Sequence, residues 1–182
     1  LLLGRYTAAA PGATEFLGEA KVWEALLPNL PMTALLRNLA RMTANGLITP
    51  MSAEARAISV RLTDGERIRK ARIHPIAVLG ALATYRQGHG ARGQLSWEPA
   101  AEVVDALDQA FYLSFGNVTA TGKRWCLALD VSASMSSGLI AGMPGLSPRI
   151  ASAALALVTA RVEPRHVITG FSHQMERIII SP

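Results

Sequence analysis

The sequence has one cysteine, few aromatic residues and no long hydrophobic run. Its 182 residues include only Cys126 as a thiol, and aromatic side chains make up 5% of the total. A single cysteine cannot form an internal disulfide, which favours a reducing, cytoplasmic location, and we expect this thiol to be buried in a strand. No run of about 18 uncharged apolar residues occurs, so we expect no membrane span. Hydrophobic residues still make up 50% of the chain, enough to bury a core.

Motifs of several enzyme classes are missing as well. The sequence contains no zinc-type Cys/His spacing, no serine nucleophile elbow, no pair of catalytic carboxylates and no phosphate-binding Walker loop. We therefore predict that the protein is not an enzyme. The functions that remain are binding functions.

One short motif does carry chemistry, and it is a carboxylate followed by two hydroxyls at alternate positions. Asp130, Ser132 and Ser134 stand in the run LALDVSASM. Residues 123–129 (KRWCLAL) read as a short buried strand in the middle of a parallel sheet, and ligands bind at the carboxyl ends of such strands. Hard oxygen donors of this kind suit Mg²⁺. The alternative is an ordinary turn or helix N-cap made by the same side chains.

The residues after this motif favour an α/β domain. Ser147 and Pro148 form the expected start of a helix, and the apolar runs 166–171 and 177–180 are typical of strands. Strand, loop, helix, strand is the opening of a doubly wound fold. A haloacid-dehalogenase phosphatase would need an acid two residues after Asp130, where Ser132 stands, so that enzyme class is excluded.

The first 120 residues read as a series of helices. Leucine and methionine recur on one side of residues 32–44, and Asn45 and Gly46 end that segment. Residues 52–62, 75–87 and a segment after Pro99 show similar spacing, which suggests a bundle or a superhelical array. The change in character near residue 120 predicts two domains, 1–120 and 121–182.

Positive charge is concentrated in the helical part. The net charge is +5, and residues 56–92 hold eight basic residues against two acids. Such a stripe attracts phosphates, although a solvated helix face has the same composition. Tyr85 and Trp97 lie near helix ends and are expected in the core.

The run DVSASM after an apolar strand resembles the metal-ion-dependent adhesion site of von Willebrand factor A domains. The resemblance implies that Asp130, Ser132 and Ser134 help to hold a divalent ion, usually Mg²⁺. The family completes the site with a threonine and an aspartate from later loops, which we expect beyond Pro182, so that the A-type domain is incomplete here. A single carboxylate leaves positive charge on the ion, which suits docking of an acidic protein ligand.

A second resemblance covers nearly the whole chain. The runs VWEALLPNLPMTALLRNLARMT, KARIHPI, TYRQGHGARGQLSWEP and TGKRWCLALDVSASM, in this order, are similar to the later part of the TROVE module and the A-type domain of Ro autoantigen family proteins. The resemblance implies a ring of HEAT-like helical repeats, monomeric at full length and closed by the A-type domain. It also implies binding of small noncoding Y RNAs, access of misfolded RNA ends to a basic hole, and transfer of RNA to an exoribonuclease.

On this basis we predict that part of the basic stripe faces RNA. The candidate RNA-binding residues are Arg67, Arg69, Lys70, Arg72, His74, His89 and Arg92. Arginine makes bidentate phosphate contacts and stacks on unpaired bases. His74 stands before Pro75, where it has the alternative role of capping the next helix. The competing function is a metal-dependent, adhesion-like protein-interaction domain on a helical stalk that binds no RNA.

Overall fold

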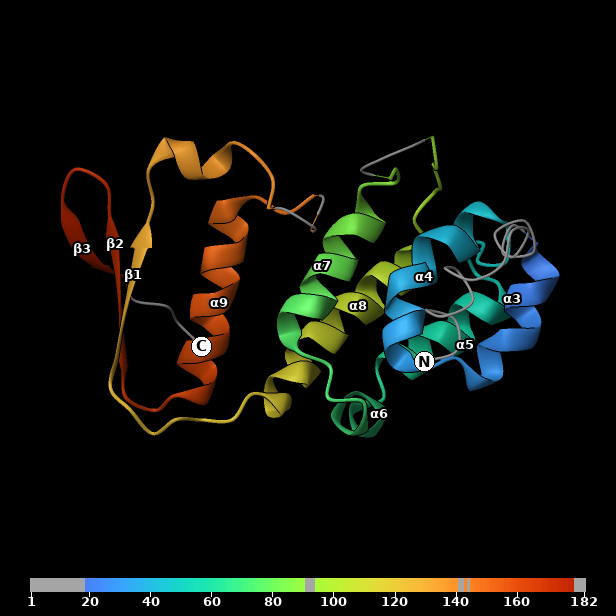
Figure 1. Ribbon diagram of the computed structural model, residues 1–182, viewed down its shortest axis with the longest axis horizontal. Helices are drawn as coiled ribbons and strands as arrows, with labels where there is room; N and C mark the ends of the chain where they lie inside the picture. The colour runs from blue at the N-terminus through green and yellow to red at the C-terminus, as the bar shows by residue number, and fades with distance from the viewer. Residues whose placement is uncertain (1–18, 91–93, 141–142, 144, 179–182) are drawn as a thin grey trace, which may run out of the picture.

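Helices form the first part of the molecule and a small sheet forms the second (Figure 1). This computed structural model describes residues 19–90, 94–140, 143 and 145–178. The helical part contains α3 (Ala20–Leu26), η1 (Leu27–Asn29), α4 (Met32–Ala44), α5 (Ala53–Leu62), α6 (Gly65–Lys70), α7 (Pro75–Arg86), α8 (Ala101–Leu113) and η2 (Ser114–Asn117). Within the described residues, no helix is both long and apolar enough to cross a membrane.

The helix boundaries follow the local signals in the sequence. α4 has the bounds that the leucine spacing predicts, and Asn45 is its C-cap. The Ser52 hydroxyl accepts a hydrogen bond from Ala55 N at 3.0 Å and so caps α5. Pro75 is the first residue of α7, where its missing N–H costs nothing.

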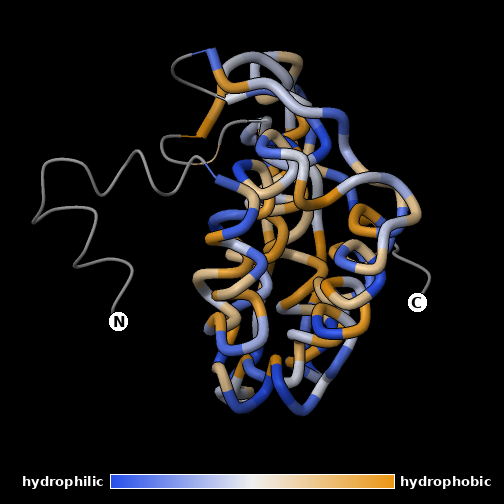
Figure 2. The backbone as a smooth tube through the Cα atoms, turned by 90° about the vertical axis from the view of Figure 1, so that its right-hand side faces the viewer, coloured by the Kyte–Doolittle hydropathy of each residue, from blue (hydrophilic) through white to orange (hydrophobic). Residues whose placement is uncertain are grey.

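The helical core is built from the aliphatic faces that the spacing indicates. Leu35 and Met42 of α4 are fully buried, as are Ile58 of α5 and Leu107 of α8. α7 packs against both α4 and α8, and α5 packs against α8. Figure 2 shows the hydrophobic residues on the inner sides of the packed segments and hydrophilic ones at the outer turns. Burial of these side chains, each contributing about 1.5–3 kcal/mol, is the main source of stability.

Two aromatic residues complete this core. Tyr85 and Trp97 are 1% and 9% exposed, and their rings stack with centroids 6.5 Å apart. The Tyr85 hydroxyl hydrogen-bonds Thr43 Oγ1 at 2.9 Å and accepts from Ala100 N at 3.2 Å. The expectation that both aromatic residues belong to the core is confirmed.

The second part is an α/β unit with a mixed sheet. Strands β1 (Trp125–Asp130) and β2 (His166–Phe171) are parallel, and α9 (Pro148–Val162) connects them, with η3 (Ala133–Ser136) directly after β1. β3 (Met175–Ile178) is antiparallel to β2, so the sheet order is β1-β2-β3. α9 lies between the sheet and α7 (Figure 1). The fold class is as predicted, helices followed by a von Willebrand factor A-like unit, with the third strand reversed.

The first strand differs from its prediction in position and in burial. β1 begins at Trp125 instead of residue 123, and its residues are exposed or half-buried. Within the described residues β1 pairs with β2 alone, and the face that carries Cys126 and Ala128 is open. The thiol of Cys126 is therefore exposed, and the expectation of a buried cysteine is wrong for this structure. The apolar run indicated a strand but could not indicate which of its faces is covered.

Residues 118–124 join the two parts. η2 ends at Asn117, and the chain crosses to β1 along the end of the molecule where α6 and the C-terminal end of α9 lie (Figure 1). The exact domain boundary near residue 120 stays a prediction.

Candidate metal site and basic surfaces

The carboxylate and hydroxyls of the predicted metal motif lie together after β1. Ser132 N donates to Asp130 Oδ1 at 2.9 Å, and the hydroxyls of Ser132 and Ser134 lie 3.0 Å apart. Asp130 is the last residue of β1 and pairs with Phe171, the last residue of β2. The motif thus lies at the carboxyl end of two parallel strands, where helices and loops leave room for a ligand.

The donor set fits a hard divalent cation. Mg²⁺ holds oxygens at 2.0–2.1 Å in octahedral geometry, which places neighbouring ligand oxygens about 2.9 Å apart. The Ser132 and Ser134 hydroxyls form a hydrogen bond with each other at 3.0 Å, a separation close to one such edge. In the described part of the chain, no group of three or more His, Cys, Asp and Glu side chains lies close enough to hold a metal ion. From the described residues, a cation here would take one carboxylate and two hydroxyls.

The electrostatics of Asp130 favour the charged form. Hydrogen bonds from the side chain and backbone N–H of Ser132 hold the pKa of this carboxyl below its ordinary value. Asp130 therefore keeps its negative charge throughout the neutral pH range, as a metal ligand must.

Sequence reasoning missed one residue that shapes this loop. The guanidinium of Arg149, in the first turn of α9, donates to the carbonyl of Ser132 at 3.1 Å and to that of Val131 at 3.4 Å. An arginine next to the helix N-cap gives no sequence signal for this role, because the contact depends on how α9 returns to β1.

The loop after the motif reaches the helical part. Met143 lies 3.6 Å from the position that a Cβ on Gly80 of α7 would occupy, and it lines an apolar groove of about 470 Å³ between α4 and α7. Gly145 has φ +83°, and a Cβ there would lie 2.9 Å from the carbonyl oxygen of Ala83. Leu146 is 1% exposed. The loop after the metal motif is therefore anchored on α7.

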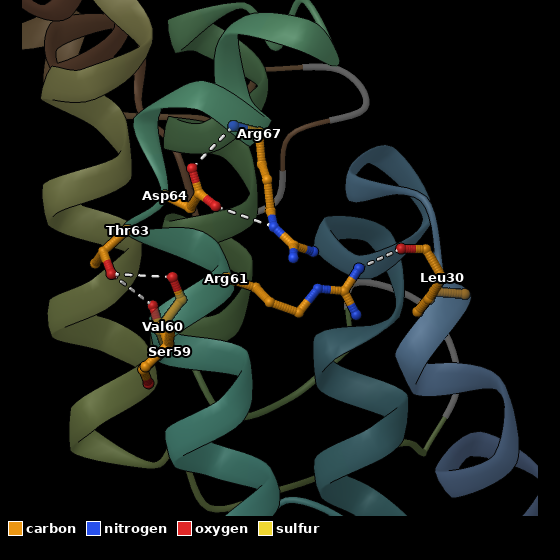
Figure 3. A network of polar contacts seen from close by, with 7 residues as sticks. All are labelled: Leu30, Ser59, Val60, Arg61, Thr63, Asp64 and Arg67. Atoms are coloured by element: carbon orange, nitrogen blue, oxygen red, sulfur yellow. Dashed lines mark hydrogen bonds and ion pairs between the residues drawn. The ribbon is translucent and has the colours of Figure 1, made fainter.

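Several cations of the basic stripe are already engaged within the protein. Arg61 donates to the carbonyls of Leu27 and Leu30, and burial lowers its pKa. Arg67 forms an ion pair with Asp64 at 3.0 Å, as Figure 3 shows beside Arg61. Part of the basic stripe therefore serves the packing and capping of helices within the protein.

The remaining residues of α6 divide into paired and free cations. Arg69 pairs with Glu66 at 2.8 Å. Lys70 and Arg72 are exposed and make no ion pair with any described residue. Arg72 also has φ +52°, a left-handed conformation that is uncommon for a residue with a side chain. Lys70 and Arg72 are therefore the cations of this segment that have no ion-pair partner among the described residues.

The two predicted histidines lie at opposite ends of α7. His74 Nδ1 accepts a hydrogen bond from Ile76 N at 3.2 Å, so the capping role considered for this residue is confirmed. His89 follows α7 and bridges to Ser96. Because α7 has 12 residues, about 18 Å separate its ends, so His89 does not join the α6 cations in one small site. Arg92 lies outside the described residues.

Fold and sites together define a class: a helical module followed by a von Willebrand factor A-like domain with a candidate metal-binding motif. Residues 13–84 match the TROVE domain family, and residues 124–182 match the Ro60 vWA domain family. The chain belongs to the Ro family.

Relatives of known name agree with this assignment. The chain is 44% identical over 164 residues to the RNA-binding protein RO60 of Deinococcus radiodurans, covering 90% of this chain and 31% of the relative. It is 46% identical over 166 residues to the RNA-binding protein RO60 of Caenorhabditis elegans, covering 91% of this chain and 25% of the relative. The crystal structure of the Deinococcus radiodurans RO (RSR) protein matches with a TM-score of 0.85 over 90% of this chain and 33% of that one. The chain thus spans about a third or less of the relatives' length.

Proposed function

We propose that this chain is part of an RNA-binding scaffold of Ro type. In this proposal the protein binds small noncoding, Y-like RNAs and the ends of misfolded RNAs, without catalysis of its own, and an exoribonuclease is a partner. The observation that carries the proposal is the identity of 44–46% over nine tenths of the chain to two relatives whose names state RNA binding.

The helical part supports the proposal with exposed, unpaired cations. Lys70 and Arg72 lie at the end of α6 and in the turn before α7, and neither forms an ion pair with a described carboxylate. The pKa of nearby Glu66 is lowered mainly by Arg69 and to a smaller extent by the charge of Lys70. Free guanidinium and ammonium groups bind phosphate without first breaking an internal ion pair. Arg67 and Arg69 would have to exchange Asp64 and Glu66 for phosphate, so we rank them behind the two free cations.

The A-like domain supplies the second part of the proposal, a divalent-cation docking site. Asp130, Ser132 and Ser134 would hold Mg²⁺ or another divalent cation, which would attract an acidic group of a protein ligand. The support is the 3.0 Å spacing of the two hydroxyls and the lowered pKa of Asp130. The monomeric ring and the cytoplasmic location are proposed on the family resemblance and on the single cysteine.

Salt-dependent RNA binding tests the main proposal. We expect the full-length protein to bind a structured small RNA with a single-stranded 3′ end and to lose affinity steeply between 50 and 200 mM salt. The double variant Lys70→Gln/Arg72→Gln should bind more weakly, and its log–log salt slope should be smaller by about 1.5. The matched control is Lys21→Gln/Arg177→Gln, which removes two exposed cations elsewhere and should bind as the unaltered protein does.

The outcome also separates this function from its competitor, an adhesion-like domain on a helical stalk. Wild-type protein that binds no RNA at 50 mM salt, but captures an acidic protein ligand that EDTA releases, would overturn the RNA-binding proposal in favour of that function. RNA binding that survives EDTA supports the scaffold, because phosphate contacts by Lys and Arg need no bound cation.

A further inference from the structure

The strongest unassigned feature lies at the end of the sheet opposite the metal motif. The parallel strands β1 and β2 begin side by side, because Trp125 pairs with His166 and Trp125 N donates to the carbonyl of Arg165 at 2.9 Å. Their first residues surround a shallow cavity of about 540 Å³. It is lined by Arg124, Trp125, Cys126, Arg165, His166 and Val167. We call this cavity the strand-start pocket.

The positive charge of the strand-start pocket is not compensated locally. Arg124 and Arg165 are exposed, as is the preceding Lys123, and none forms an ion pair with a described residue, although one nitrogen of the Arg165 guanidinium donates to the Gly122 carbonyl. The adjacent acid, Glu163, is only 3% exposed, and its carboxylate accepts hydrogen bonds from the backbone of the linker. The pocket therefore presents cations to solvent with no carboxylate in its lining, which is the charge pattern of an anion-binding surface.

Trp125 adds an aromatic surface to these cations. This residue is 38% exposed, whereas Trp23 and Trp97 are 0% and 9% exposed. The indole Nε1 donates to Thr121 Oγ1 at 3.2 Å, which fixes the ring beside the linker. A fixed, partly exposed indole beside guanidinium groups is a stacking platform for an unpaired base.

The same end of the molecule carries the free cations of the helical part. The Asn117 side chain donates to the carbonyls of Ile68 and Ile73 and so holds the start of the linker on the turn that contains Arg72. The linker then runs from that turn to Lys123, along the edge where α6 and the strand starts lie (Figure 1). Residues 118–122 contain no acid, so the linker itself adds no negative charge between the two groups of cations, and the carboxylate of Glu163 that contacts it belongs to a residue only 3% exposed.

We propose that the strand-start pocket binds a segment of single-stranded RNA. One base stacks on Trp125, and Arg124 and Arg165 contact the phosphates on either side of it. The RNA chain that continues from the pocket follows the linker toward Arg72. This inference rests on the proposed RNA-binding function and gives it a second site, outside the helical part.

The shape and chemistry of the pocket favour single-stranded RNA over other polyanions. An unpaired base gains stacking energy on an aromatic ring, and a carboxylate of an acidic peptide cannot stack in this way. The bases of a duplex are already stacked on each other, so Trp125 offers a duplex little. Arginine contacts the backbone through bidentate bonds to phosphate and distinguishes no base, so we expect little sequence preference.

The test uses full-length protein and a 12-nucleotide oligouridine RNA containing one 5-bromouridine. Binding is followed by fluorescence anisotropy at several salt concentrations, and ultraviolet cross-linking with mass spectrometry maps the contact. We expect cross-links on the peptide that contains Trp125 and their loss in Trp125→Leu. Arg124→Gln/Arg165→Gln should weaken binding about tenfold and reduce the salt slope by about 1.4, because two phosphate contacts are lost. Arg124→Lys/Arg165→Lys should retain most of the slope, and Lys21→Gln/Arg177→Gln should change neither quantity.

Each failure has a different meaning. Wild-type protein that binds no RNA at all would overturn the proposed function together with this inference. If Arg124→Gln/Arg165→Gln binds RNA as tightly as wild type does, and cross-links occur only in the helical part, the proposed role of the strand-start pocket is overturned. The proposed RNA-binding function would stand in that case. Equal competition by a 12-residue polyglutamate would show a general anion surface and also contradict the inference. If circular dichroism shows that the double variant does not fold, the single variant Arg124→Gln serves as the test instead, because no described hydrogen bond holds the Arg124 side chain.

Discussion

Glu163 holds the linker through Thr121: the carboxylate of Glu163, at the C-cap of α9, accepts a hydrogen bond from Thr121 N at 2.6 Å. It accepts a second one from Gly122 N at 3.1 Å, and Arg165 donates to the Gly122 carbonyl from the other side. One buried carboxylate therefore fixes the path by which the chain passes from the helices into the sheet. It also sets the position of Trp125, three residues after Gly122.

Substitution of Glu163 should destabilise the protein in a pH-dependent way. Hydrogen bonds from the backbone of Thr121, its side chain and Gly122 lower the pKa of Glu163. The unfolded chain therefore takes up a proton at a higher pH than the folded protein does. The stabilisation is fully present above the unfolded value of about 4.3, and it is lost as pH falls through the lowered folded pKa. Thermal unfolding of Glu163→Gln and Glu163→Ala should show lower melting temperatures than wild type at pH 7, with the larger drop for alanine.

The pH series provides the control for this prediction. The difference between wild type and Glu163→Gln should stay constant from pH 8 to 6 and shrink below about pH 4. A difference that grows on acidification would have the wrong sign for a carboxylate with a lowered pKa.

Asp130→Asn should weaken Mg²⁺ binding by roughly tenfold or more, because the variant removes the negative charge among the three donors. Isothermal titration calorimetry with Mg²⁺ on the full-length protein measures this loss, and Ser134→Ala should weaken binding as well. Ser136→Ala is the matched control, since Ser136 is an exposed serine of η3 outside the motif. Equal Mg²⁺ affinity in Asp130→Asn and wild type would disprove the metal assignment. Because hydrogen bonds hold the pKa of Asp130 below its ordinary value, acidification should release Mg²⁺ only at a pH below the ordinary range of an aspartate carboxyl.

Gly145→Ala should release the loop that anchors the metal motif on α7. Alanine at φ +83° is strained by about 1 kcal/mol, and its Cβ would lie 2.9 Å from the Ala83 carbonyl oxygen. Gly138→Ala separates the two effects, because Gly138 has φ +82° but no atom within 4 Å of its Cβ position. We expect faster amide hydrogen exchange at Ile140 and Leu146 in Gly145→Ala than in Gly138→Ala. Equal exchange in both variants would show that the contact with Ala83 does not hold the loop.

Tyr85→Phe should cost about 1–3 kcal/mol of unfolding free energy, because it leaves the buried Ala100 N–H without its acceptor. Thr43 also loses the Tyr85 hydroxyl as a hydrogen-bond partner, but its own hydroxyl still donates to the Leu39 carbonyl at 3.0 Å. Tyr112→Phe is the control, since Tyr112 is 56% exposed, and urea unfolding of the two variants should differ accordingly. A loss for Tyr85→Phe no larger than that for Tyr112→Phe would contradict this account.

Local signals in the sequence were sufficient to locate most of the secondary structure. The bounds of α4 and β2 are those that the hydrophobic spacing indicates, and Ser147 caps α9 as its position before Pro148 predicts. These features depend on side chains within a few residues of each other, so periodicity and capping preferences are enough to find them. The order of runs along the chain was enough for the family.

The burial of a strand and the ion pairs of the cations could not be predicted from local sequence signals in the same way. The run that forms β1 has the composition of a buried strand, yet Cys126 is exposed, because burial depends on which elements cover each face of the sheet. Likewise, Arg67 and Lys70 look equivalent in the sequence. Arg67 forms an ion pair with Asp64, whereas Lys70 forms none with a described residue, and that distinction depends on the geometry of the side chains around α6.

The sequence by itself determined the family, the helices, the order of the modules and the cluster of Asp130, Ser132 and Ser134, because these follow from short-range patterns. The tertiary structure decided which cations are free, since Arg61 reaches the carbonyls of Leu27 and Leu30 from more than thirty residues away. It also decided that Arg124 and Arg165, which directly precede two strands distant in the chain, lie together beside Trp125. Contacts between segments distant in the chain depend on how helices and sheet pack, and no local pattern records them.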